Sequence, residues 1–161
     1  MRYCSREEAD KEIKAYIEEL RKNAGIIPAI KKTVQEFDGK VLNCRLEKAL
    51  EAATGQYIHV EKRYNTLAIY GYYKSHYMTF ASVSLDTLTD GKRINAAAMI
   101  ESLNDCRTKM LQEANEMEQQ MQNVDIIRQQ LESIKKLYEA VVSPVNSMIA
   151  DYYRIEKYAR F

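Results

Sequence analysis

The sequence has little of what disulfide frameworks, metal centres and flexible linkers require. Its 161 residues include only two prolines, five glycines, three cysteines and two histidines. Cys4, Cys44 and Cys106 form no Cys-x-x-Cys pair and have no histidine at metal-ligand spacing, which is typical of incidental or buried thiols in a reducing compartment. The glycines fall where elements are expected to end, so the sequence indicates no flexible linker between domains.

An excess of charge of one sign and long apolar runs are missing as well. The chain has 24 basic and 23 acidic residues, a balance without the long-range attraction of a dedicated binder of nucleic acid or anionic membrane. No apolar run approaches the roughly 20 residues of a spanning helix, and the first residues lack the apolar core of a secretory signal. We therefore expect no membrane association and a cytoplasmic location.

Motifs that carry catalysis are also missing. We find no glycine-rich phosphate loop, nucleophile elbow, His-Glu-x-x-His sequence or EF-hand loop. The sequence therefore predicts a non-enzymatic protein without a cofactor or metal. One enzymatic alternative remains, a cleft near His59 and His76, because strand alternation would place His59 and Glu61 on one face of a sheet.

Local signals predict three N-terminal helices. Ser5 and Glu8 have the spacing of a capping box, which starts the first helix, and Gly25 is expected to end it. Pro28 is expected to start the second helix, since proline is favoured at the first helical position. The third helix is predicted over residues 43–55, with an asparagine as its N-cap and a glycine at its end.

Residues 56–93 change to a strand-like pattern followed by a polar loop. Three runs rich in Tyr, Ile, Val, Thr and Phe span Tyr57–Tyr64, Leu67–Tyr73 and Tyr77–Leu85. Their connections are too short for a crossover helix, so they predict a three-stranded antiparallel β-meander. A sheet this small needs a helical layer against one face to be stable.

The last third of the chain repeats an apolar residue at every seventh position. The repeat comprises Ala96, Leu103, Met110, Met117, Val124, Leu131, Tyr138, Val145 and Tyr152. A second apolar series, offset by three residues, accompanies it with two interruptions. A heptad repeat kept for this long predicts a helix that supercoils against a partner helix, and the breadth of the apolar face favours a bundle of three or more helices.

The predicted helix begins near Ile94 and is too long for a compact domain to cover. Residues 94–142 would span about 70 Å, whereas the radius of gyration of a globular chain of this size is about 15 Å. Pro144 is expected to kink the helix without reversing it, because the heptad phase continues past it. A bend near Asn123 is the alternative.

The predicted fold is therefore α+β, a single domain with N-terminal helices over 1–55, a β-meander and loop over 56–93, and a long C-terminal helix that forms a helical bundle. We expect a homo-oligomeric interaction or scaffold protein, with another protein partner as the alternative. The predicted oligomer interface comprises Leu103, Met110, Met117, Met121, Val124, Ile127, Leu131 and Ile134.

The tyrosine-rich sheet suggests a possible recognition surface. Tyr70 and Tyr72 share one strand face, and Lys62 and Lys74 lie nearby in the sequence. Rings that receive unstacked bases beside cations that hold phosphates would suit a small single-stranded nucleic-acid-binding accessory protein. The more economical interpretation is that tyrosine packs well on a half-buried sheet, so nucleic acid is possible but not favoured.

Overall fold

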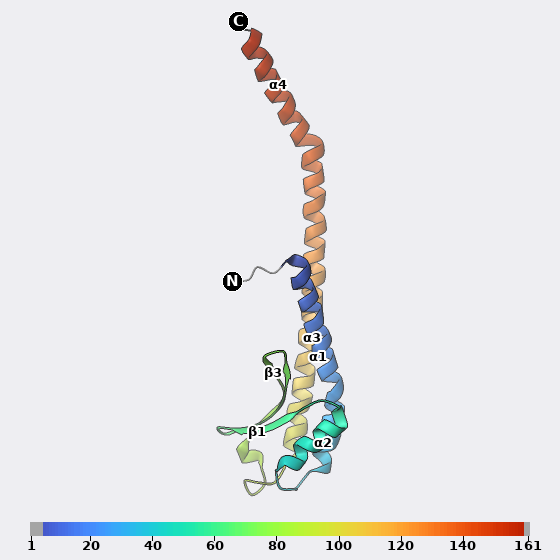
Figure 1. Cartoon of the computed structure of the whole chain (residues 1–161), viewed down its shortest axis with the longest axis vertical. Helices are drawn as coiled ribbons and strands as arrows, with labels where there is room; N and C mark the ends of the chain where they lie inside the picture. The colour runs from blue at the N-terminus through green and yellow to red at the C-terminus, as the bar shows by residue number, and fades with distance from the viewer. Residues whose placement is uncertain (1–4, 160–161) are drawn as a thin grey trace. The chain divides into compact units, whose positions relative to one another are not determined.

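The computed structural model describes residues 5–159 and shows the predicted α+β fold (Figure 1). N-terminal helices precede a three-stranded antiparallel sheet, and a long helical segment follows it. The chain divides into two compact units, Met1–Glu118 and Gln119–Phe161. The sheet lies in the first unit, and the end of the long helical segment makes up the second.

Helix α1 (Arg6–Glu36) is one helix, where the sequence predicted two. The capping box is present: the Ser5 hydroxyl accepts from the Glu8 N–H, and the Glu8 carboxylate accepts from the Ser5 N–H. Neither Gly25 nor Pro28 ends the helix, although an interior proline costs about 3 kcal/mol. The fully buried isoleucines 27 and 30 offset this cost, because burying each contributes about 1.5–3 kcal/mol.

Helix α2 (Cys44–Thr54) confirms the last of the predicted N-terminal helices. The Asn43 side chain accepts a hydrogen bond from the Arg45 N–H at 2.9 Å, as an N-cap does. Gly55 ends the helix in the left-handed conformation, with φ of 70°. Both boundary residues act as their sequence signals predict.

The strands β1 (His59–Arg63), β2 (Thr66–Tyr73) and β3 (His76–Ser84) form the predicted meander in the order β1-β2-β3. A β-bulge interrupts the β2–β3 register, since consecutive residues of β2 pair with Ala81 and Thr79. Phe80 is the extra residue, and the bulge lets Phe80 and Ala81 both be buried.

The helices cover one face of this sheet and enclose the core of the first unit. The core contains large side chains from α1, from α2, from the sheet and from the start of the long helical segment that follows the sheet. Those that are fully buried are Leu20, Ile27, Ile30, Leu46, Leu50, Ile58, Leu67, Ile69, Phe80, Ile94, Met99 and Leu103. The opposite face of the sheet is left to polar and aromatic side chains.

Helix α3 (Ala96–Leu137) begins two residues after the predicted start and is fixed to the end of α1. The Asp38 carboxylate accepts from the Ala96 N–H at 2.9 Å and so caps α3. A short 3-10 turn, η1 (Leu85–Thr87), precedes it. Farther along, Tyr16 of α1 donates to Glu113 of α3 at 3.3 Å.

The second unit is helical throughout its described residues. The end of α3 is followed by a π-helical turn, η2 (Tyr138–Val142), and by α4 (Ser143–Ala159). Helix α3 passes Asn123 without a break, so the predicted alternative of a bend there is wrong. The interruption expected at Pro144 takes the form of the π turn, in which the Ser143 N–H bonds to the Tyr138 carbonyl, five residues back.

Candidate recognition surface and association face

Strand alternation gathers an aromatic cluster on the open face of the sheet. Tyr70 pairs with His59 of β1, and Tyr72 pairs with Tyr77 of β3. Residues that face each other across an antiparallel pair point to the same side, so the four rings share one face. We define the aromatic cluster as the side chains of Tyr57, His59, Glu61, Arg63, Tyr70, Tyr72 and Tyr77.

Tyr70 lies at the centre of the aromatic cluster. The His59 ring stacks on it at 5.0 Å between centroids, and the Tyr77 ring meets it edge-on at 5.1 Å. The Tyr70 hydroxyl donates a hydrogen bond to the Glu61 carboxylate at 2.7 Å. These neighbours leave Tyr70 only 6% exposed, although it lies on the face that the helices do not cover.

Arg63 supplies the positive charge of the aromatic cluster. Its guanidinium lies 5.2 Å from the Tyr70 ring centroid and 4.7 Å from that of Tyr77. It also donates to the Glu61 carboxylate at 3.0 Å and to the Tyr77 hydroxyl oxygen at 3.2 Å. The cation is therefore paired with a carboxylate inside the cluster.

These contacts shift the ionisation of the tyrosines in opposite directions. The hydrogen bond to Glu61 raises the pKa of Tyr70 far above its usual value. The same bond, with that from Arg63, lowers the pKa of Glu61. The hydrogen bond from Arg63 lowers the pKa of Tyr77, because it favours the phenolate. Two neighbouring tyrosines thus differ in acidity.

The predicted recognition residues are only partly brought together. Tyr70 and Tyr72 do share a face, but Tyr70 is shielded while Tyr72 is 51% exposed. Lys62 pairs with Leu67 and therefore lies on the other face. The Lys74 ammonium lies 5.5 Å from the ring centroid of Tyr73, which is not a cluster member. Neither lysine supplies the cation of the cluster.

The sequence interpretation missed the roles of Arg63, His59 and Tyr77. The signal for them was available in the turns, because two-residue connections after Arg63 and Tyr73 fix the register of both hairpins. The register also separates the two histidines. His76 pairs with Tyr73 and lies on the opposite face from His59, so the two do not share one cleft.

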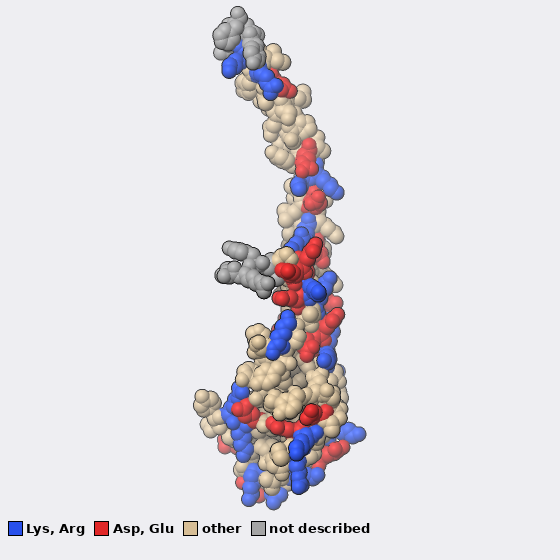
Figure 2. All heavy atoms as spheres, viewed as in Figure 1, with Lys and Arg blue, Asp and Glu red and all other residues tan. Residues whose placement is uncertain are grey.

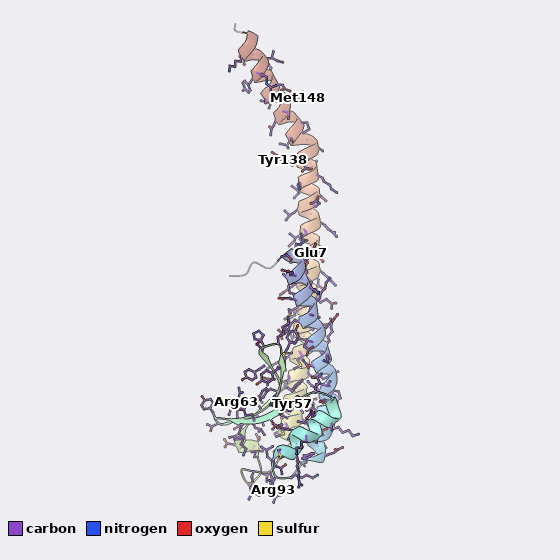
Figure 3. The ribbon with its side chains drawn as sticks, in the orientation of Figure 1. Glu7, Tyr57, Arg63, Arg93, Tyr138 and Met148 are labelled. Carbon is purple, nitrogen blue, oxygen red and sulfur yellow. The ribbon has the colours of Figure 1, made fainter. Side chains whose placement is uncertain are left out.

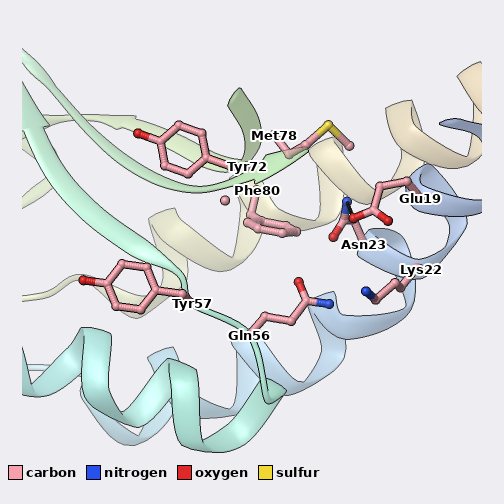
Figure 4. A pocket seen from close by; sticks show the side chains of 9 residues that line it. Glu19, Lys22, Asn23, Gln56, Tyr57, Tyr72, Met78 and Phe80 are labelled. Atoms are coloured by element: carbon pink, nitrogen blue, oxygen red, sulfur yellow. Dashed lines mark hydrogen bonds between the residues drawn. The ribbon is translucent and has the colours of Figure 1, made fainter. Parts of the chain in front are cut away.

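A cavity of about 340 Å³ lies beside the aromatic cluster (Figure 4). It opens between Tyr57 and Tyr72, with Phe80 between them, and α1 closes its far end. Its lining residues are Glu19, Lys22, Asn23, Gln56, Tyr57, Gly71, Tyr72, Met78 and Phe80. The cavity lies entirely within the first unit.

The predicted oligomer interface is divided between buried and exposed positions. Leu103 and Met110 belong to the chain's own core, so they offer a partner almost no surface. Met117 and Met121 are half-buried. The four predicted interface residues that belong to the second unit are 43–62% exposed. They are Val124, Ile127, Leu131 and Ile134.

The exposed heptad positions continue beyond the π turn. Figure 3 shows Tyr138 at this turn and Met148 farther along α4. We define the association face as the apolar residues of the two heptad series from Val124 onward, every one of which is exposed by 43–70%. It comprises Val124, Ile127, Leu131, Ile134, Tyr138, Val141, Val145, Met148, Tyr152 and Ile155.

Other classes of site find little support in the described residues. Within residues 5–157, no three His, Cys, Asp or Glu side chains gather as metal ligands would. Cys44 is exposed, burial raises the pKa of Cys106, and Cys4 lies outside the described residues. None of the described helices combines the length and apolarity needed to cross a bilayer.

Comparison with known proteins assigns no family to this chain. No protein-family model matches it, and no curated protein or solved structure is significantly similar to it.

Proposed function

We propose that the protein is a non-enzymatic interaction or scaffold protein that self-associates through its association face. The observation that carries the proposal is the exposure of ten large heptad side chains in one helical segment. A patch of this kind exceeds the few hundred Å² that monomers usually leave in water. Covering it with a second helix would stabilise the assembly by about 25 cal/mol for each Å² of apolar area removed from water.

The heptad spacing specifies what kind of surface fits the face. Between Val124 and Ile134, apolar residues alternate at steps of three and four, which is the seam of a coiled coil. Charged residues flank it, for example the exposed Asp125 and the half-buried Arg128, which form an ion pair at 3.4 Å. A helix with the same pattern is therefore the best complement for the face.

The charges of the second unit favour another copy of the same chain as that helix. Residues 119–161 contain five acidic and six basic side chains, a net charge of +1. Figure 2 shows the two signs interspersed along the visible surface of this segment. Two copies therefore bring together surfaces of nearly zero net charge, which do not repel one another.

Paired substitutions with a matched control test the proposal. Val124→Asp with Leu131→Asp places two carboxylates on the association face. Gln122→Asp with Gln129→Asp adds the same number, seven residues apart, on the opposite side of the helix. Light scattering should give a multiple of 18.7 kDa for the unmodified chain and for the glutamine variant. The variant with carboxylates on the association face should give the monomer mass.

A monomeric unmodified chain would overturn the proposal. So would an assembly whose mass survives the substitutions on the association face, because another surface would then hold it together. Circular dichroism of each variant separates dissociation from unfolding, since the sheet of the first unit should keep its signal.

The half-exposed tyrosines of the aromatic cluster support a second candidate, binding of single-stranded nucleic acid. Tyr72 and Tyr77 offer ring faces beside Arg63. The Glu61 carboxylate neutralises that arginine, so the surface lacks the unpaired cations that hold phosphates. Binding of an oligothymidylate that weakens with salt and is lost in Tyr72→Ala with Tyr77→Ala would favour this candidate over a pure scaffold.

A further inference from the structure

The cavity beside the aromatic cluster has one aromatic side and one polar end. Tyr57, Tyr72 and Phe80 provide three rings, and Met78 adds a polarizable thioether. Figure 4 shows the side chains of Asn23 and Gln56 directed toward the Phe80 ring from the other end. A volume of about 340 Å³ lies within the range of small-molecule sites.

Asn23 points most clearly to a ligand. Its side chain comes from α1 and is only 2% exposed, so its polar atoms need partners. The amide nitrogen donates to the Glu19 carboxylate at 3.4 Å. No hydrogen bond of the described residues ends on the Asn23 Oδ1, and this oxygen keeps some accessible surface, since every shielded side-chain oxygen of those residues has a partner. A buried amide that directs an unused acceptor into a cavity is suited to a ligand that carries an N–H donor.

The main chain at Gly71 brings the strand close to the cavity. A Cβ at this position would lie 3.3 Å from the Cε2 atom of Phe80 and 3.9 Å from the Tyr57 carbonyl oxygen. Because glycine carries no side chain, the Phe80 ring packs against the main chain here and is only 1% exposed. The backbone here does not require glycine, since its φ is not positive. Space, and not conformation, is what this glycine provides.

We propose that the cavity binds an amino-bearing nucleobase. The ring would lie between Tyr57 and Tyr72, which are 63% and 51% exposed, because aromatic side chains are the usual stacking partners of unpaired bases. The exocyclic amino group would donate to Asn23, and the Gln56 amide would supply a second donor and acceptor. Asparagine and glutamine amides match the edge of adenine, which presents a donor beside an acceptor. The proposal does not depend on self-association.

A pair of matched ligands tests the recognition chemistry. Adenosine carries the amino group, and purine riboside differs from it only in lacking that group. Equilibrium dialysis of the full chain should show saturable binding of adenosine and about tenfold weaker binding of purine riboside. Benzyl alcohol, an aromatic ring of low polarity, should bind more weakly than either nucleoside.

Two glycine variants locate the site. Gly71→Ala should weaken adenosine binding, because the added methyl group would press on Phe80 and shift the wall of the cavity. Gly25→Ala is the control, since nothing lies within 4 Å of its Cβ position and it is remote from the lining. In amide NMR spectra of the deuterated chain, adenosine should shift the Gly71 resonance and leave that of Gly25 in place.

Substitutions of the polar lining residues test the other end of the cavity. Asn23→Leu should weaken adenosine binding about tenfold while leaving the weak binding of benzyl alcohol unchanged. If this buried substitution unfolds the chain, Gln56→Ala at a half-buried position provides the same comparison. A short oligoadenylate distinguishes the source of the base: tighter, salt-sensitive binding indicates nucleic acid, and equal binding indicates a free nucleoside.

Several results would overturn the proposal. The proposal fails if adenosine and cytidine both show no binding at millimolar concentration. Equal binding of benzyl alcohol and adenosine would make the cavity a nonspecific apolar site. An unchanged affinity in Gly71→Ala would place the bound adenosine elsewhere on the chain.

Discussion

The Ser102 hydroxyl accepts a hydrogen bond from the Ser82 N–H at 2.9 Å and donates one to the carbonyl of the same residue at 3.1 Å. Ser82 lies on β3, whose outer edge has no strand partner among residues 5–159, and these two bonds replace those of a neighbouring strand. At the other edge of the sheet, the Glu47 carboxylate of α2 accepts from the Val60 N–H at 2.7 Å. Helix side chains thus hydrogen-bond main-chain N–H and C=O groups at the two sheet edges, groups that could otherwise pair with an added strand.

Removing the Ser102 hydroxyl should weaken this arrangement. In Ser102→Ala the Ser82 N–H and carbonyl lose their partner, and we expect a loss of about 0.5–1.5 kcal/mol in the free energy of unfolding. The Ser82 amide should also exchange its hydrogen faster. Urea unfolding and amide exchange measure the two effects.

A second serine of α3 gives the control for that experiment. The Ser133 hydroxyl donates only to the Gln129 carbonyl within its own helix, so Ser133→Ala removes a hydroxyl without touching the sheet. The two variants should differ mainly at β3. Equal effects on stability and on Ser82 exchange would mean that the Ser102 contact contributes nothing to the edge.

The aromatic cluster should show two tyrosines that titrate out of order. The pKa of Tyr77 is lowered by the hydrogen bond from Arg63, and that of Tyr70 is raised by its bond to Glu61. Ultraviolet difference absorbance should therefore lose an early ionisation step in Tyr77→Phe. Glu61→Gln should shift the Tyr70 step toward lower pH, whereas Glu51→Gln on α2 should not.

The pH dependence of stability follows from the same directions. Folding lowers the pKa of Glu61, so its contribution is complete above the usual value of 4.5 and is lost as the pH falls through the folded value. Folding raises the pKa of Tyr70, so its contribution is complete below the usual value of 10.0 and is lost as the pH rises through the folded value. Stability that rises on acidification in the carboxylate range would contradict the Glu61 contact.

Pro144 explains the π turn and gives a fourth prediction. Proline has no N–H to donate to the Ala140 carbonyl, and its ring clashes with that carbonyl, so the chain closes a wider turn through Ser143 and Tyr138. Pro144→Ala should restore an α-helical turn and stabilise the segment locally by about 3 kcal/mol. Slower amide hydrogen exchange across residues 138–142 would show this local stabilisation.

The control for the π turn is a substitution that keeps the proline. Ser147→Ala changes an exposed residue of α4 to alanine and should leave residues 138–142 as they are. If both variants slow exchange equally, alanine propensity and not the missing N–H is the cause.

The sheet could be predicted from sequence because local signals determine it. Strand-like runs locate the three strands, and alternation along the second strand places Tyr70 and Tyr72 on one face, as predicted. The exposure of these residues could not be predicted in the same way. It depends on which rings surround Tyr70, and those come from all three strands and the segment before β1.

The heptad repeat predicted a partner-facing helix without identifying the partner at each position. Leu103 and Met110 obey the same spacing as Val124 and Leu131, yet the first two are buried within the first unit and the last two are exposed. Periodicity shows that one face of a helix is apolar, but it does not show which residues cover that face. Only the packing of the N-terminal helices and the sheet decides where the chain's own core ends.

Gly25 and Gly55 provide the last prediction, because the same residue type has opposite roles at the two positions. Gly25 lies inside α1 with helical dihedrals, so Gly25→Ala should stabilise the chain by about 0.5–1 kcal/mol. Gly55 has φ of 70°, so Gly55→Ala should destabilise it by about 1–2 kcal/mol. The sequence signal gave both glycines the role of helix end. If thermal unfolding shows that Gly25→Ala destabilises as Gly55→Ala does, α1 ends at Gly25 and the helix through Pro28 is wrong.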